Sequence, residues 1–169
     1  MSNLVLIGMP GSGKSTCGVL AAKALCKDFA DTDLLIQKAE GMPLQRIIDE
    51  RGNAYFAEAE EKAICEASFR NAVVATGGSV VYSPRAMAYL KEKGVVVYLR
   101  ISYETMKKRI ANIATRGIIL RDGETLAEMY AERAPLYEKY ADFSVDCDET
   151  EVERVVSEIV RLGREKEGK

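Results

Sequence analysis

Histidine is absent from this 169-residue sequence, and its absence excludes several classes of chemistry. A serine or cysteine nucleophile activated by imidazole, and a zinc ion held by histidine ligands, cannot be built without it. Tryptophan is absent as well. No apolar run approaches the roughly 18 residues of a membrane-spanning helix, because the longest runs, 4–7 and 95–99, have the length of strands. We therefore expect no membrane partner.

Cysteine is scarce and scattered along the chain. The four cysteines form no C-x-x-C pair and stand among apolar neighbours: Cys17, Cys26, Cys65 and Cys147. We interpret them as reduced thiols that act as small core hydrophobes, not as a disulfide framework or a metal site.

Neither sign of charge is in excess, since 24 basic and 26 acidic residues leave a net charge of −2. That balance gives no reason to expect a nucleic acid as partner.

The length fits one domain, 1–169, in which strand-like and helix-like segments alternate. Apolar strand signals lie at 4–7, 29–30, 72–75, 95–99 and 143–145. Helix signals cover 14–27, 34–69 with breaks at 41–43 and 52, then 84–93, 102–111, 124–140 and 152–163, before a charged tail at 164–169. Strict alternation predicts an α/β fold, with a parallel sheet and helices on both faces.

The two ends of this domain carry little further information. The chain passes from Met1 into a strand-like run within three residues, which leaves no room for a signal peptide. We therefore expect a cytoplasmic protein, and the near-neutral charge leaves a monomer and a weak dimer open.

The first chemical motif comes directly after the first strand. Residues 8–15, Gly-Met-Pro-Gly-Ser-Gly-Lys-Ser, match the phosphate-binding pattern G-x-x-x-x-G-K-[ST] in full and lead into a helix. Backbone N–H groups of the loop would close around phosphate oxygens, with Lys14 on the β- and γ-phosphates and the Ser15 hydroxyl on Mg²⁺. The residues predicted to bind ATP here are Gly11, Ser12, Gly13, Lys14, Ser15 and Thr16.

The rest of the chain disfavours several classes of protein that use such a loop. A GTPase needs an N-K-x-D motif on a late strand, and the sequence has none. An ATPase of the Walker B type needs an apolar strand that ends in aspartate, and 29–31 matches this only weakly. The pattern favours a small kinase whose second substrate binds at the carboxyl ends of the strands.

Candidates for that second site come after the second and third strands. Asp31 and Asp33 stand two positions apart, so in extended structure their side chains point to the same side. Asp33 could orient an acceptor hydroxyl and take its proton late, with Asp31 nearer the metal; either could instead be a helix cap. Gly77 and Gly78 end the third strand, where they permit close approach of a ligand or form a plain turn.

At this point the sequence resembles the shikimate kinases, within the P-loop small-molecule kinases. The resemblance runs through residues 3–160, and its motifs are 8–16, 31–33, Gly52…Phe56…Glu60, 75–78, 94–99, Arg116, 133–137 and 141–142. It implies a three-layer P-loop sandwich with a five-stranded parallel sheet in the order 2-3-1-4-5. It also implies ATP with Mg²⁺, a lid at about 112–122, and a place in aromatic amino-acid biosynthesis.

The resemblance also implies roles for individual residues. Lys14, Asp33 and Arg116 would be catalytic, and Arg109 and Arg116 would bind ATP. The acceptor would be held by Asp33, Gly77, Gly78 and Arg133, with Arg133 on its carboxylate. Ser15 would bind the metal directly, and Asp31 would lie behind the direct ligands. From the residues alone, Arg133 is compatible with a carboxylate-binding role, but the favoured interpretation is a solvated helix arginine.

Three positions depart from the family pattern. Ala57 stands where the family has a second acceptor-binding arginine, Ser79 replaces the third glycine, and Gly117 comes after Arg116 in place of proline. When one of two arginines that bind a carboxylate is lost, the binding free energy weakens by roughly 1.5–3 kcal/mol, which lowers the affinity by about one to two orders of magnitude. A neighbouring arginine could replace it, and the candidates are Arg46, Arg51 and Arg70.

These observations lead to one main hypothesis and two alternatives. We expect an ATP-dependent kinase that phosphorylates a hydroxyl of a small acceptor, with shikimate as the leading candidate. Because position 57 is alanine and not arginine, the first alternative is a kinase of the same fold that acts on another hydroxylated acceptor, such as gluconate or homoserine. A nucleotide-binding regulatory module without turnover is the third hypothesis, which the joint presence of Lys14, Ser15, Asp33, Arg116 and Arg133 disfavours.

Overall fold

Five parallel strands form the central sheet, and the computed structural model describes residues 3–111 and 118–167 around it. The strands are β1 Asn3–Ile7, β2 Asp28–Asp31, β3 Ala72–Ala75, β4 Gly94–Arg100 and β5 Phe143–Asp146. Their order is β2-β3-β1-β4-β5, and every neighbouring pair is parallel. In the central strand, Leu4 stands opposite Val73 on one side and Val95 on the other. The order and the direction of the strands confirm the prediction.

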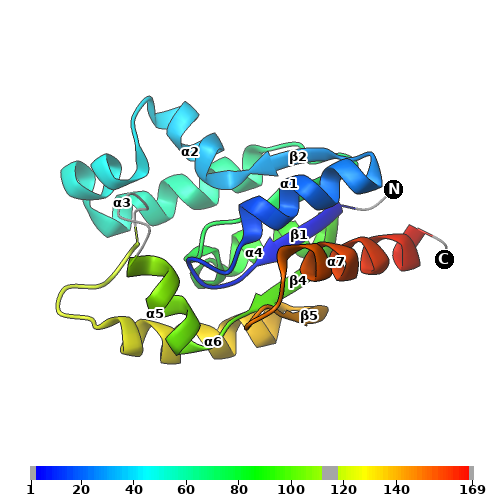
Figure 1. The fold of residues 1–169 in the computed structure, drawn as a ribbon. Helices are drawn as coiled ribbons and strands as arrows, with labels where there is room; N and C mark the ends of the chain where they lie inside the picture. The colour runs from blue at the N-terminus through cyan, green and yellow to red at the C-terminus, as the bar shows by residue number, and fades with distance from the viewer. Residues whose placement is uncertain (1–2, 112–117, 168–169) are drawn as a thin grey trace.

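Helices cover both faces of this sheet and give the three layers expected. They are α1 Lys14–Leu25, α2 Thr32–Glu40, α3 Leu44–Glu66, α4 Pro84–Lys93, α5 Tyr103–Ala111, α6 Leu126–Tyr140 and α7 Val152–Glu167, with a 3₁₀ turn, η1, at Val80–Tyr82. Figure 1 shows α1 and α7 packed together in front of the sheet and α4 behind the sheet. On that second face, α3 packs against α4. No helix in the described ranges is long and apolar enough to span a membrane.

The core is built around β1, whose side chains are buried on both faces. Leu4, Val5, Leu6 and Ile7 are each at most 1% exposed. Such a strand is a continuous apolar run in the sequence, because both faces of a parallel sheet are covered by helices. The chain leaves β1 at the carboxyl edge of the sheet. Here α2 and α3 lie on one side, and α5 and the start of α6 on the other (Figure 1).

Helix boundaries depend on local signals in the sequence. The Ser83 hydroxyl accepts a hydrogen bond from the Ala86 N–H at 3.0 Å, so Ser83 caps α4 as predicted. Thr125 and Glu128 form a capping box at the start of α6. Gly52, with φ 82° and ψ 168°, divides α3 at one of the predicted breaks.

Two local predictions were wrong. The last helix continues through Gly163 to Glu167, although the sequence indicated an end near Gly163 and a tail from 164. A Cβ at Gly163 would lie 2.9 Å from Leu25 Cδ1 and 3.0 Å from Leu4 Cδ1, so this glycine permits close packing of α7. Cys17 and Cys147 are buried as expected, but Cys26 is exposed at the end of α1.

Candidate active site

The loop between β1 and α1 has the conformation that phosphate binding requires. Gly11 and Gly13 have φ of 78° and 92°, so the backbone turns sharply before α1 begins at Lys14. The ammonium of Lys14, a residue only 6% exposed, donates to the carbonyls of Gly8 at 2.8 Å and Met9 at 2.9 Å. A buried cation and the N-terminus of α1 therefore meet in one place, and both favour an anion.

Ser15 and Asp31 contact each other across the first two strands. The Ser15 hydroxyl donates to Asp31 Oδ2 at 2.7 Å, and Asp31 Oδ1 accepts from the Asp33 N–H at 3.0 Å. Asp31 therefore caps α2, which was one interpretation of the sequence, and also contacts the predicted metal ligand, which was the other. A hydroxyl and a carboxylate are the hard oxygen donors that Mg²⁺ prefers.

One cavity joins the phosphate loop to the predicted acceptor residues. It has a volume of about 250 Å³, and its lining includes Lys14, Ser15, Asp31, Asp33, Thr76, Gly77, Gly78 and Ile118. The Asp31 and Asp33 side chains both line this cavity, but Asp33 lies in the first turn of α2 and not in the extended structure that the prediction assumed. A phosphate held by the loop and a hydroxyl held at Asp33 would both lie in this cavity.

Arg109 joins the loop from α5. Its guanidinium donates to the carbonyls of Gly11 at 3.1 Å and Cys147 at 3.0 Å. It lines a second cavity, of about 420 Å³, together with Gly11, Ser12, Gly13, Thr16 and Cys17. The predicted ATP-binding residues that the structure describes therefore line two cavities, with Lys14 and Ser15 on the first and the others on the second. Arg116, the remaining predicted catalytic and ATP-binding residue, lies outside the described residues.

Arg133 is a buried cation within α6. Only 2% of the residue is exposed, and its Nη2 donates to the Ile119 carbonyl at 2.6 Å. Its guanidinium lies 5.3 Å from the centre of the Tyr82 ring, and its Nε has no hydrogen-bond partner within the described residues. The interpretation of Arg133 as a solvated helix arginine was wrong. A buried guanidinium with an unused N–H is suited to an anionic ligand.

Glu60 is a site residue whose role sequence reasoning missed, although the residue belongs to one of the family motifs. It is 3% exposed, its Oε2 accepts from the Ser79 hydroxyl at 2.7 Å, and its Oε1 has no partner among the described residues. A Cβ on Gly77 would lie 2.8 Å from Glu60 Oε1 and 2.9 Å from Asp33 Oδ1, so the two carboxylates face the same point. One feature of the sequence could have identified Glu60 as buried: it stands four residues from both Phe56 and Ile64, so the three side chains share one face of α3.

The pKa of Glu60 is raised to about 7, mainly by burial. The charge of Asp33 also raises this pKa, while the hydrogen bond from Ser79 and the charge of Arg133 lower it. The folded state therefore holds a proton that the unfolded state releases near pH 4.5. The free energy of unfolding should fall by about 3 kcal/mol from this group as pH rises from 4.5 through 7. Glu60→Gln should remove that part of the pH dependence, which urea unfolding at pH 5 and pH 8 would measure.

Glu58→Gln is the matched control, because Glu58 is an exposed position on the same helix. It should leave the difference in unfolding free energy between pH 5 and pH 8 as in the wild type. An unchanged pH difference in Glu60→Gln would show that Glu60 is ionised in the folded state throughout this range.

None of the three arginines proposed to replace the missing one lines the cavities described here. Arg46 pairs with Glu50 at 2.5 Å on the surface. Arg51 pairs with Glu40 at 2.7 Å, and Arg70 is exposed. Ala57 itself lines a cavity of about 480 Å³ together with Glu60, Ser79 and Tyr82.

Comparison with known proteins places the chain in a family. A family model described as shikimate kinase matches residues 10–163. The shikimate kinase of Caldanaerobacter subterraneus subsp. tengcongensis is 35% identical, with 95% of each chain covered. That of Thermodesulfovibrio yellowstonii is 37% identical, covering 95% of this chain and 94% of the relative.

Solved structures agree with this placement. The structure of shikimate kinase from Acinetobacter baumannii in complex with shikimate superposes with a TM-score of 0.89 at 27% identity, covering 100% of this chain and 96% of that one. The phosphate loop, the strand order and the two near-complete sequence matches lead to one conclusion. This chain belongs to the shikimate kinase family and is an ATP-dependent kinase that phosphorylates an alcohol group.

Proposed function

We propose that this protein transfers the γ-phosphoryl group of ATP to a hydroxyl of shikimate. The observation that carries the proposal is the placement of Asp33 and Arg133 on one pocket, together with Gly77, Gly78 and Glu60. Shikimate is a hydroxylated ring that bears a carboxylate. Asp33 offers a hydrogen-bond acceptor to its hydroxyls, and the buried guanidinium of Arg133 offers a charge-assisted partner to its carboxylate.

The reaction depends on the positions of the charged groups. Asp33 accepts a hydrogen bond from the attacking hydroxyl and orients it toward the phosphate loop. As the new P–O bond forms and the bond to ADP breaks, the hydroxyl proton passes to Asp33. Lys14 and the N–H groups of the loop stabilise negative charge on the phosphoryl oxygens, which is the main contribution a kinase makes to this step.

The residues around Ser15 fit a magnesium ion. Its hydroxyl would be a direct ligand and Asp31 would hold that hydroxyl in place, since the two oxygens already lie 2.7 Å apart. Mg²⁺ is usually bound by one or two protein groups together with substrate phosphates, so a dedicated protein cage is not required. When bound, the ion would neutralise charge on the β- and γ-phosphates.

The test is a screen of acceptors with the purified protein. ADP release should depend on shikimate, and gluconate and homoserine should give kcat/KM values at least about a hundredfold lower, because neither presents the ring that the pocket would hold. Reactions without an acceptor control for simple ATP hydrolysis. Faster ADP release with gluconate or homoserine than with shikimate would refute the choice of acceptor.

Ala57→Arg should lower the KM for shikimate. The new guanidinium would project from α3 into the cavity beside Ser79 and Tyr82 and complete a clamp on the carboxylate. The gain should be smaller than the roughly 1.5–3 kcal/mol of a charged hydrogen bond, because ordering the side chain costs entropy. Steady-state kinetics would measure it, with Ala57→Gln as the uncharged control.

A low wild-type KM that Ala57→Arg leaves unchanged would show that the residues already present balance the carboxylate completely. A fall in shikimate turnover in Ala57→Arg would instead show that the cavity beside position 57 must stay open.

A further inference from the structure

A shikimate carboxylate in the acceptor pocket could accept more hydrogen bonds than Arg133 alone donates. Asp33 and Glu60 point their carboxyl oxygens at the same place beside Gly77, and a shikimate carboxylate would add a third acidic group. Arg133 already uses Nη2 for the Ile119 carbonyl. Two carboxylate oxygens can accept about four hydrogen bonds, so one partly engaged guanidinium leaves part of that capacity unused. A second cation near the carboxylate would complete the site.

Most cations at this end of the molecule are poorly placed for that task. Lys14 is held by the carbonyls of the phosphate loop. Lys62 and Arg85 line the cavity beside Ala57, but Arg85 pairs with Glu61 and its side chain is 77% exposed. Arg85 lies near Cys65, which is about 12 Å along α3 from Ala57, and Lys62 is about 7.5 Å along the same helix from Ala57, at a rise of about 1.5 Å per residue.

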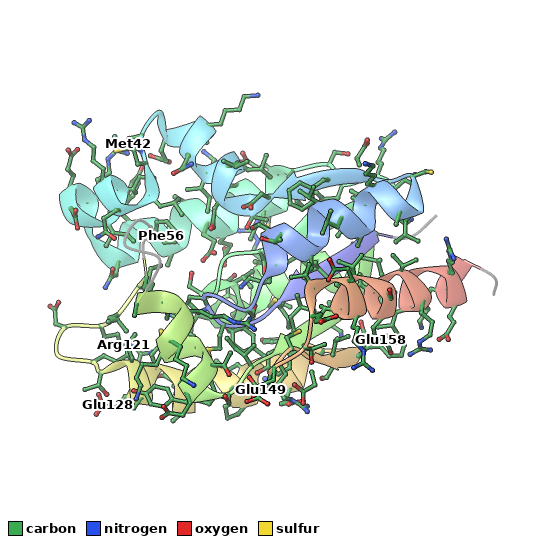
Figure 2. All side chains as sticks on the ribbon, in the orientation of Figure 1. Met42, Phe56, Arg121, Glu128, Glu149 and Glu158 are labelled. Carbon is green, nitrogen blue, oxygen red and sulfur yellow. The ribbon has the colours of Figure 1, made fainter. Side chains whose placement is uncertain are left out.

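Arg121 is better placed, because it shares a ring with Arg133. The guanidinium carbon of Arg121 lies 5.6 Å from the centre of the Tyr82 ring, and that of Arg133 lies 5.3 Å from the same centre. Tyr82 lines the cavity that Ala57 also lines. Figure 2 shows Arg121 on the segment before α6, at the same end of the molecule as Phe56 of α3.

The backbone beside Arg121 is fixed over the acceptor pocket. Arg133 donates to the Ile119 carbonyl at 2.6 Å, and Asn53 Nδ2 donates to the Leu120 carbonyl at 2.9 Å. Ile118 and Ile119 line the pocket with Arg133. Arg121 is therefore the next residue of a segment that two side chains from different helices hold in place, and only its side chain must turn to reach the carboxylate.

The present partner of Arg121 does not hold it strongly. Its guanidinium pairs with Glu132 at 2.7 Å and 3.2 Å, and the two side chains are 66% and 38% exposed. Exposed ion pairs contribute little to stability, so Arg121 can leave Glu132 and bind a substrate carboxylate at a small cost in free energy. We propose that Arg121 binds the acceptor carboxylate opposite Arg133 and supplies part of the charge missing at position 57. This proposal rests on shikimate being the acceptor.

The test is the kinetics of Arg121→Gln beside Glu132→Gln. Arg121→Gln should raise the KM for shikimate about tenfold, the low end expected for a charge-assisted bond, and leave kcat and the KM for ATP within about twofold. Glu132→Gln breaks the same ion pair but keeps the arginine, so its KM for shikimate should stay the same or fall. Addition of Ala57→Arg to Arg121→Gln should restore the KM.

The methyl ester of shikimate separates charge recognition from packing. Its ester is neutral, so Arg121→Gln should change the kcat/KM for the ester by less than about twofold. An unchanged KM for shikimate in Arg121→Gln would overturn the proposal, and so would equal increases in Arg121→Gln and Glu132→Gln, which indicate a structural ion pair. A wild type that does not phosphorylate shikimate would refute the proposed function itself.

Discussion

Replacing Lys14 with methionine should lower kcat by at least about 10²–10³-fold, the usual cost of removing one preorganised group that stabilises transition-state charge. Lys14 is 6% exposed, and its ammonium is held at the carbonyls of Gly8 and Met9, within the loop that would surround the phosphates. Methionine keeps most of the length and the apolar part of the side chain, and it removes the charge together with its hydrogen-bond donors. Single-turnover rates with saturating ATP and shikimate would measure the loss.

The fold of Lys14→Met should survive. The ammonium donates to loop carbonyls and to the Ser12 hydroxyl, and the apolar core around β1 does not depend on these hydrogen bonds. Thermal unfolding and circular dichroism close to those of the wild type would confirm this. Turnover at the wild-type rate by the methionine variant would remove Lys14 from the catalytic assignment.

Asp33→Asn should lower kcat by about 10²–10⁴-fold, the range for loss of a positioned general base. Asparagine can still accept a hydrogen bond from the acceptor hydroxyl, but it cannot take the proton. The KM for ATP should change little, because the ATP-binding residues of the loop are untouched. Asp28→Asn is the matched control, since Asp28 is an exposed aspartate at the start of the preceding strand, β2.

A change in kcat below about threefold in Asp33→Asn would contradict the assignment, since loss of a general base costs about a hundredfold or more. It would show that the proton leaves to solvent, with Asp33 acting only as a structural residue in the first turn of α2.

The sheet and the phosphate loop could be predicted because they depend on local sequence. A strand buried on both faces, such as Leu4–Ile7, must be apolar throughout, so its sequence identifies it. The loop motif fixes a backbone conformation through the glycines Gly11 and Gly13. The order of the strands came from the resemblance, and the structure confirms it.

The acceptor side could not be predicted to the same depth, because it is assembled from distant segments. Glu60 and Ser79 are 19 residues apart in the chain and meet only in the fold. Arg121 gives no local signal, since its placement depends on the ring of Tyr82. Arg46, a candidate chosen for nearness in sequence, points to the surface.

Gly163 illustrates the same limit in the core. A glycine near the end of a helical pattern usually marks a stop, and the sequence alone offers no other interpretation. Here the glycine is needed because α7 packs against α1, where Leu25 leaves no room for a Cβ. Tertiary packing overrode the local signal.

Direct observation of the product tests the central claim best. Purified protein incubated with ATP, Mg²⁺ and shikimate should give one phosphomonoester of shikimate for each ADP formed, as measured by ³¹P NMR. The Asp33→Asn variant under the same conditions should give almost none. ADP formed without a shikimate phosphomonoester, or formed equally in the absence of shikimate, would contradict the account.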